Sequence, residues 1–222
     1  ALVSFNPEKK SFTTIDKEKD GTPFTSQRIT ILFRDSHKRL WVGGEEGISV
    51  FQQEGIEIEK VPILPESSVT KTFTNCIYEA ANGIIWVGTR EGFYYFNEKE
   101  KKIKRYTTAN GLPNNVVYGI LEDTFGRLWV STNRGISCFN PETERFRNFT
   151  ESDGLQSNQF NTSSFCRTSS GQMYFGGING ITTFRPELLL DNPSTPPVVI
   201  TKLQLFNLSL IHISEPTRLR RI

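Results

Sequence analysis

The stretch GRLWVSTNRGISCF, Gly126 to Phe139, decides the fold because it occurs four times. The other copies are KRLWVGGEEGISVF (38–51), GIIWVGTREGFYYF (83–96) and GQMYFGGINGITTF (171–184). Three landmarks keep the same intervals through the copies. They are the aromatic anchors Trp41, Trp86, Trp129 and Tyr174, the glycines Gly47, Gly92, Gly135 and Gly180, and the phenylalanines Phe51, Phe96, Phe139 and Phe184. A period of roughly 40 to 50 residues with strand-like content is typical of β-propeller blades.

Each unit is predicted to form a four-stranded antiparallel meander. In the clearest unit the expected strands are 116–122, 127–131, 136–140 and 145–149, joined by short turns. The glycine that ends each link between the second and third strands suits a positive φ. Leu128 and Val130 point to one face of their strand and Trp129 to the other. Because stacked blades bury both faces, we interpret the repeated tryptophan as interblade packing rather than as a ligand platform.

The chain is therefore expected to be all-β, a partial β-propeller with about four full four-stranded antiparallel blades. Residues 1–15 are the last strands of a truncated blade, and residues 16–187 are the four blades. Asn6-Pro7-Glu8 recurs as Asn140-Pro141-Glu142 and nearly as Arg185-Pro186-Glu187, which indicates hairpin turns. After Phe184 several prolines break the period, and an alternating run from Val198 to Phe206 predicts the first strand of a different β domain.

Charge and cysteine content exclude several classes of protein. The formal net charge is +2, but the final segment, 208–222, contributes three arginines and one glutamate, so the rest of the chain is neutral. Such an array has no overall charge to attract nucleic acid or an acidic membrane surface. Cys76, Cys138 and Cys166 fall at different places in their repeats, which argues against a disulfide or metal framework. We therefore expect no metal, no cofactor and no membrane contact.

Catalytic motifs were sought in the repeats as well. Glycoside hydrolysis needs two carboxylates on one side of a sugar, but Glu122 and Asp123 are neighbours on a strand and point to opposite faces. Glu45 and Glu46 are interpreted as a solvated hairpin tip. The sequence has no Gly-x-Ser-x-Gly elbow and no phosphate-binding loop. We predict no catalytic residue in this chain.

The best candidates for ligand binding lie in the links before first strands and in hairpins. Amide side chains there suit hydrogen bonds to sugar hydroxyls, Phe160 suits stacking on a sugar ring, and arginines at matching hairpin positions suit charge-assisted bonds. The candidates are Asn114, Asn115, Gln159, Phe160, Asn161, Arg90 and Arg134. The alternative for these residues is turn capping and solvation.

The amino-acid sequence of the repeat resembles that of a known repeat family. Asn110 to Pro141, NGLPNNVVYGILEDTFGRLWVSTNRGISCFNP, resembles the two-component regulator propeller repeat, and 154–187 looks like the closing blade of such sensors. PPVVITKLQLFN (196–207) is similar to the start of the immunoglobulin-like Tyr-Tyr-Tyr module that follows them. On this basis 188–207 is a linker and the module's first strand. The segment 208–222 resembles translated sequencing-adapter read-through or vector sequence, and we treat it as a non-native tail.

The resemblance implies a hybrid sensor histidine kinase of the Bacteroidetes type, with this chain at the end of its second periplasmic propeller. Its expected function is to bind an oligosaccharide signal, or to relay that binding to the kinase, without catalysis of its own. The expected partners are the remaining blades, the immunoglobulin-like module and a second copy of the full protein. The alternatives are a carbohydrate-active propeller enzyme, a hydrolase or lyase with catalytic residues in other blades, and a pure interaction scaffold.

Overall fold

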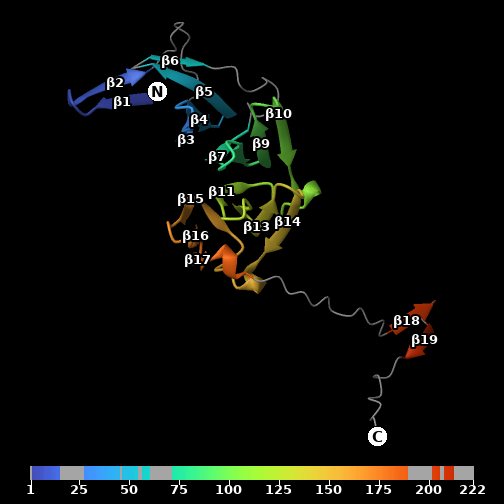
Figure 1. Cartoon of the computed structure of the whole chain (residues 1–222). Helices are drawn as coiled ribbons and strands as arrows, with labels where there is room; N and C mark the ends of the chain where they lie inside the picture. Colours follow the sequence, from blue (N-terminus) through green and yellow to red (C-terminus); the bar gives the residue numbers. More distant parts are fainter. Residues whose placement is uncertain are drawn as a thin grey trace. The chain divides into compact units, whose positions relative to one another are not determined.

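The structure is a computed structural model that describes residues 2–15, 28–45, 47–54, 57–60, 72–189, 202–205 and 208–212. The chain divides into two compact units, Ala1–Leu188 and Leu189–Ile222. The first unit is a succession of separate antiparallel sheets that follow one another in chain order (Figure 1). The described part of the chain contains no helix that is long and apolar enough to span a membrane.

The sheets match the repeat. A two-stranded sheet pairs β1 (Leu2–Asn6) with β2 (Ser11–Ile15). Three four-stranded sheets follow, made of β3 (Ile29–Arg34), β4 (Leu40–Gly44), β5 (Gly47–Glu54) and β6 (Glu57–Lys60); of β7 (Thr74–Glu79), β8 (Ile85–Thr89), β9 (Phe93–Asn97) and β10 (Lys102–Tyr106); and of β11 (Val117–Glu122), β12 (Leu128–Thr132), β13 (Gly135–Asn140) and β14 (Arg145–Phe149). The last sheet contains β15 (Phe160–Arg167), β16 (Met173–Gly177) and β17 (Gly180–Phe184).

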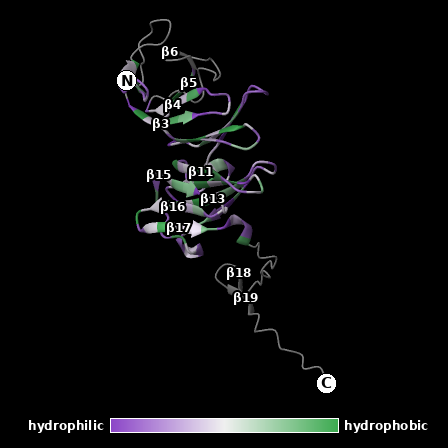
Figure 2. Ribbon diagram, turned by 60° about the vertical axis from the view of Figure 1, so that its left-hand side comes forward, coloured by the Kyte–Doolittle hydropathy of each residue, from purple (hydrophilic) through white to green (hydrophobic). Residues whose placement is uncertain are grey.

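The all-β propeller-blade prediction is confirmed, with one difference. Within the described residues the last sheet has three strands where four were expected. Short 3-10 turns stand between sheets: η1 (Thr108–Asn110), η2 (Glu151–Asp153) and η3 (Pro186–Leu188). Hydrophobic residues lie along the strands and hydrophilic ones gather at the turns (Figure 2).

Each tryptophan anchor packs against the sheet that follows it. Trp41 is in one cluster with residues of β7 and β8, and Trp86 is in the next with Leu128 and Val130 of β12. Trp129, from the opposite face of β12, clusters with Phe175 of β16 and its neighbours. One strand therefore contributes alternate residues to two different cores, as the repeat predicted. Each core is a seam between two sheets, and neither sheet could bury that surface alone.

Tyr174 occupies the fourth anchor position and is only half-buried. No sheet follows β15–β17 in the described part of the unit, so nothing covers this face there. Ile181 shows the same effect: it is 67% exposed, while the equivalent Ile136 is 0% exposed. The repeat residues at this end are of the expected type, but the described part of the unit holds no further sheet on which they could pack.

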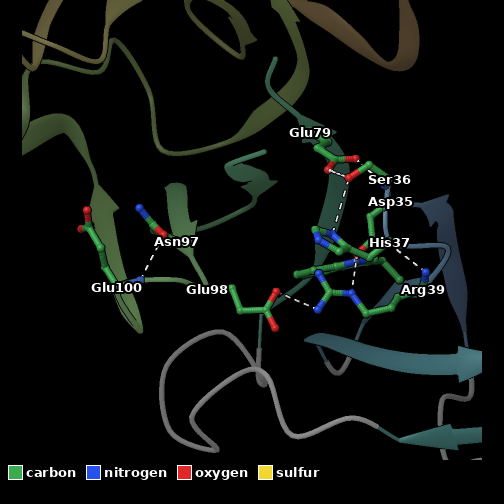
Figure 3. Close-up of polar contacts among 9 residues, drawn as sticks. Asp35, Ser36, His37, Arg39, Glu79, Asn97, Glu98 and Glu100 are labelled. Atoms are coloured by element: carbon green, nitrogen blue, oxygen red, sulfur yellow. Dashed lines mark hydrogen bonds and ion pairs between the residues drawn. The ribbon is translucent and has the colours of Figure 1, made fainter. Parts of the chain in front are cut away.

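Two of the tryptophans are held by a buried ionic cluster. Asp35 accepts hydrogen bonds from Trp41 Nε1 (2.8 Å) and Arg39 Nε (2.6 Å), and Arg39 also reaches Glu98 of the next sheet at 2.7 Å (Figure 3). Burial raises the pKa of Asp35, but the hydrogen bonds from Trp41 and Arg39 outweigh that effect, so the pKa lies below its usual value.

The aspartate, arginine and tryptophan of this cluster recur two blades further on, but not in the blade between. Asp123 accepts from Trp129 Nε1 (2.9 Å) and Arg127 Nε (2.7 Å). In the intervening blade Ala80 stands in place of the aspartate and Ile84 in place of the arginine. Both charges are replaced together, so neither is left buried without its partner.

The link glycines behave as expected. Gly47, Gly92, Gly135 and Gly180 all have positive φ, between 92° and 150°. The requirement is strictest at Gly135, where a Cβ would lie 2.1 Å from the carbonyl oxygen of Phe149. Backbone conformation and lack of space therefore both favour glycine at this turn.

The cysteines are dispersed through the described unit. Cys76 and Cys138 are buried in different clusters and Cys166 is exposed. Burial raises the pKa of Cys76 to about 12, so its thiol is unreactive at neutral pH.

The second unit pairs β18 (Lys202–Leu205) with β19 (Leu208–His212). The first strand falls within the alternating run expected to start a new module. The second lies in the segment interpreted as a non-native tail. Residues 190–201 and 213–222 lie outside the described residues, and the origin of the tail stays a prediction.

Candidate functional site

The predicted ligand-binding residues come from the links at one end of the sheets, where the first strands begin and the second strands end. We call this end the turn face. Here the link between the second and third strands of a blade meets the residue that precedes its first strand. The same backbone hydrogen bond joins them in four blades: Glu45 N to Arg28 O (3.2 Å), Arg90 N to Phe73 O (3.1 Å), Asn133 N to Val116 O (3.3 Å) and Ile178 N to Gln159 O (3.4 Å). The turn face is therefore a repeated arrangement, with a framework fixed by the backbone.

Asn114 and Asn115 are half-buried and cap the backbone. The Oδ1 of Asn114 accepts from Val116 N at 2.8 Å, and that of Asn115 accepts from Thr108 N at 2.9 Å. The capping role weighed from the sequence thus exists for both amide oxygens. The Nδ2 groups take no part in these two bonds, so donors remain while the caps fix the orientation of each side chain.

The next blade repeats this capping with residues that the sequence reading passed over. Asn158 Oδ1 accepts from Glu151 N at 2.9 Å, as Asn115 does from Thr108, and Ser157 Oγ accepts from Gln159 N at 3.3 Å. The signal was the alignment of NGLPNN (110–115) with DGLQSN (153–158), in which the final asparagine is the repeated residue.

Phe160 does not have the predicted role. Its side chain is 3% exposed and its ring meets that of Phe175 edge-on, with 6.3 Å between centroids. The prediction that it stacks on a sugar ring is wrong, because the position is equivalent to the fully buried Val117 of the preceding blade. Its place in a link suggested that Phe160 is exposed, but the register of β15 points its side chain into the hydrophobic core.

Gln159 and Asn161 flank Phe160 and are exposed. The carbonyl of Gln159 accepts from Gln156 Nε2 at 3.1 Å, and Gln156 Oε1 in turn accepts from Asn179 N at 2.8 Å. Asn161 begins a stretch, 161–164, in which the pairing of β15 with β16 shifts register. The first strands of the other blades shift by a single residue at this place, so the last blade presents a longer irregular segment.

Arg90 and Arg134 are both exposed but are not equivalent, so the predicted match is wrong by one residue. The backbone bond to Phe73 aligns Arg90 with Asn133, and the bonds of Glu91 N and Arg134 N to the preceding threonine hydroxyls align those two residues. The guanidinium of Arg90 lies 3.9 Å from the centre of the Phe73 ring. That of Arg134 makes no hydrogen bond or ion pair with another residue of the described part.

The single-residue shifts hold neighbouring blades together. Thr30 Oγ1 donates to Thr74 O at 2.6 Å, and Asn75 Nδ2 donates to Val117 O at 2.8 Å. Thr30 and Asn75 are the bulged residues of their strands, and each reaches the carbonyl at the start of the next blade's first strand. Sequence periodicity did not reveal these bonds, because a bulge leaves the repeat length unchanged.

Three of the carboxylates considered as catalysts, Glu122, Asp123 and Glu45, make structural bonds, and Glu46 lies outside the described residues. Glu122 Oε2 accepts from Ala81 N at 2.9 Å and Tyr78 OH at 3.3 Å, which ties two sheets together. Both oxygens of Asp123 hold Arg127 and one also holds Trp129, while Glu45 pairs with Arg28 at 2.9 Å. In the described part of the chain no three His, Cys, Asp or Glu side chains gather as a metal site would require.

Comparison with known proteins extends these observations. A family model described as two component regulator propeller matches residues 67–91 and 111–134. The chain is 30% identical over 213 residues to histidine kinase P4 of Formosa agariphila, which covers 94% of this chain and 16% of that protein. It thus spans about a sixth of the length of the curated relative it matches.

Solved structures give the same fold. The extracellular domain assigned to the hybrid two-component system BT3049 of B. thetaiotaomicron superposes with a TM-score of 0.70 at 26% identity, over 92% of this chain and 29% of that one. Virginiamycin B lyase from Staphylococcus aureus superposes with a TM-score of 0.57 at 18% identity, over 82% and 62% of the two chains. The second similarity shows the propeller fold alone.

Proposed function

Because this chain carries two-component regulator propeller repeats and is similar to a histidine kinase, we propose that it is part of an extracytoplasmic glycan sensor. In this proposal the chain lies in the periplasm and binds an oligosaccharide on its turn face, or relays binding by another part of the propeller. It passes the signal through an adjoining immunoglobulin-like module to a kinase and has no catalytic role itself.

One observation carries the proposal: asparagine side chains of the turn face are held in place by caps on the backbone. Asn115 and Asn158 are fixed at equivalent positions of neighbouring blades by the same bond to a 3-10 turn. Side chains that are ordered before binding lose less conformational entropy when a ligand arrives. Amide donors fixed in this way suit the hydroxyl groups of a sugar, and so does the exposed Arg134, whose guanidinium makes no hydrogen bond or ion pair with another residue of the described part.

A relay requires two arrangements of the receptor. A ligand shifts their equilibrium only by the difference between its affinities for them. We propose that ligand binding changes how propellers pack between two copies of the full protein, and that the adjoining module carries that change toward the membrane. The seams between sheets, each a separate core, are rigid enough to transmit such a displacement.

The alternative is a carbohydrate-active propeller enzyme, a hydrolase or lyase. It is less well supported because Glu122, Asp123 and Glu45 are all committed to structural bonds. An interaction scaffold without a small ligand is a third possibility, and the capped amides and the exposed Arg134 favour the sensor over it.

The experiment uses the complete extracytoplasmic region of the natural protein. A panel of oligosaccharides is titrated by calorimetry, and the products of prolonged incubation are analysed by chromatography. We expect one glycan class to bind without turnover. Loss of a charge-assisted hydrogen bond in Arg134→Ala should weaken binding about tenfold or more.

The matched control is Arg145→Ala, since Arg145 is also exposed but lies at the start of β14, at the other end of its sheet. This variant should bind as the natural protein does. Release of cleaved sugar would contradict the non-catalytic sensor and support the carbohydrate-active enzyme instead. If Arg134→Ala leaves binding unchanged, the glycan does not bind on the turn face of this chain.

A further inference from the structure

The chain contains three Asn-Gly pairs, and each lies in a turn or link of the first unit. The pairs are Asn82-Gly83, Asn110-Gly111 and Asn179-Gly180, and all three asparagines are exposed. This dipeptide is reactive because glycine has no Cβ, so its backbone nitrogen can approach the side chain of the preceding asparagine. Exposure does not distinguish the three pairs, but their hydrogen bonds do.

The first pair is restrained at both of the atoms that would react. Asn82 Oδ1 accepts from Ile84 N at 3.1 Å, which holds the side chain in its turn. Gly83 N donates to Ala80 O at 2.8 Å. A reaction between the Gly83 nitrogen and the Asn82 side chain therefore has to break both hydrogen bonds first.

The second pair is restrained in the same way. Asn110 Oδ1 accepts from Thr107 N at 2.9 Å and from Thr107 Oγ1 at 3.3 Å, in the capping box of η1. Gly111 N donates to Thr108 O at 3.2 Å. Asparagine and glycine are thus both held at this turn as well.

The third pair lacks the restraint on the side chain. The side-chain amide of Asn179 makes no hydrogen bond with another residue of the described part, and its backbone N–H donates to Gln156 Oε1 at 2.8 Å. A Cβ at Gly180 would meet nothing within 4 Å, so the space beside this residue is open. Gly180 pairs with Gly177 at the hairpin end of the last described sheet, where local opening costs less than in the middle of the array.

The exposure of Asn179 comes from its place in the link between β16 and β17. Glu91 and Arg134 occupy the equivalent position in the two preceding blades, one residue after the backbone bond that defines the turn face. Both are exposed although another sheet follows each of them. A further sheet after β17 would therefore leave Asn179 accessible to water.

We propose that Asn179 is a site of spontaneous deamidation. The Gly180 backbone nitrogen loses its proton and attacks Cγ of Asn179, and the side-chain amide leaves as ammonia, which closes a succinimide ring. Water then opens the ring at either carbonyl, so the products are aspartate and isoaspartate. The sum of these steps consumes one water and releases one ammonia, with no change of oxidation state.

Either product places a carboxylate on the turn face, where the original side chain is a neutral amide. Isoaspartate also adds a carbon atom to the backbone of the link, so the bond from the residue 179 N–H to Gln156 cannot keep its geometry. The turn face of an aged molecule then differs in charge and backbone path from that of a newly made one, whether or not a glycan binds there.

The test follows the three pairs in one sample. The 222-residue chain is incubated at mildly alkaline pH and digested with pepsin in acid. Liquid chromatography with mass spectrometry then resolves the asparagine, aspartate and isoaspartate forms of each peptide. We expect Asn179 to be converted about tenfold faster or more than Asn82 and Asn110, because the side-chain oxygens of those two residues are held by hydrogen bonds.

The same incubation in concentrated urea separates the effect of structure from that of sequence. In the unfolded chain the three pairs should react at similar rates, since the restraints on Asn82 and Asn110 are gone. Equal rates in the folded chain, or the same difference between rates in urea, overturns the proposal.

The variant Asn179→Gln provides the matched control, because glutamine has to close a less favourable six-membered ring. On ion-exchange chromatography the folded variant should no longer accumulate the more acidic form at the fast rate of the natural chain. Accumulation of that form at an unchanged rate would also overturn the proposal, since the reacting residue would then lie elsewhere.

Discussion

At the scale of single residues, the four repeats keep the backbone conformation of the link more strictly than they keep the side chains that bind the tryptophan. The link glycine occurs in all four copies, and its backbone conformation, with φ between 92° and 150°, disfavours other residues. The aspartate that binds the tryptophan occurs in only two of the four copies. In a third copy Ala80 replaces the aspartate and Ile84 replaces its arginine partner. Position in the fold therefore determines which changes a single residue tolerates.

Gly135→Ala should destabilise the chain more than Gly126→Ala. Both glycines have positive φ, 92° and 73°, but a Cβ meets the Phe149 carbonyl at 2.1 Å only in the first. Left-handed strain costs about 1–3 kcal/mol, and the clash adds to it only at Gly135. Urea unfolding followed by circular dichroism measures both variants, and equal midpoints would contradict this account of the turn.

Asp35→Asn should remove part of the acid sensitivity of the protein. The pKa of Asp35 is held below its usual value of 3.8 in the folded state, so its stabilising effect is complete above about pH 4. As the pH falls from there through the folded pKa, that contribution is lost. The variant should be less stable at pH 7 by about 1–3 kcal/mol, and the gap should narrow below pH 4.

Chemical denaturation at pH 7, 5, 4 and 3 measures the gap between natural and variant chains. Glu142→Gln, a change of an exposed acid, is the control and should give no comparable narrowing. A gap that stays constant down to pH 3 would mean that Asp35 does not titrate in the way described.

At the scale of elements, the sequence predicted strands well because two periodicities agree. Alternation along a strand and the interval of about 44 residues between blades place 145–149 correctly and the neighbouring strands to within one residue. It failed at the hairpin expected for Arg185-Pro186-Glu187: Arg185 stands where Asn6 and Asn140 accept hydrogen bonds from their turns, and the chain forms η3 there instead. It also failed for Phe160, because exposure depends on the register of β15 against β16, which no local pattern encodes.

The Asp35–Arg39 pair beside Trp41 and the apolar Ala80–Ile84 pair at the equivalent positions of the next blade should be interchangeable, provided that both residues are exchanged together. Asp35→Ala alone leaves Arg39 buried beside Glu98 and should cost about 3–5 kcal/mol. Adding Arg39→Ile copies the arrangement of Ala80 and Ile84 and should recover most of that loss. Unfolding of the two single variants and the double variant forms the cycle, and additive losses would show that the two residues do not act as a pair.

At the scale of the whole array, stability is shared between neighbouring sheets. Each core is a seam between two successive sheets, so the middle sheets are covered on both faces and the terminal ones on one. Stacked repeats of this kind behave as a sum of unit and neighbour terms. Order should therefore be greatest in the middle of the chain and least at its ends.

Amide hydrogen exchange should follow this gradient. Amides of β8, β9, β12 and β13 should be the slowest, and those of β1, β2 and β17 should exchange faster, because opening a terminal sheet breaks one seam instead of two. Mass spectrometry of peptic fragments resolves the sheets. Uniform protection from β1 to β17 would mean that the array opens only as a single body.

The tryptophan anchors give this array a built-in spectroscopic record. The chain has three tryptophans, and each is buried in a different seam: Trp41 before β7–β10, Trp86 before β11–β14 and Trp129 before β15–β17. The indoles of Trp41 and Trp129 donate to a carboxylate, while Trp86 is surrounded by aromatic rings. Replacing any two by phenylalanine leaves one tryptophan, so comparing the tryptophan emission of the three resulting variants reports which seam between blades loosens first.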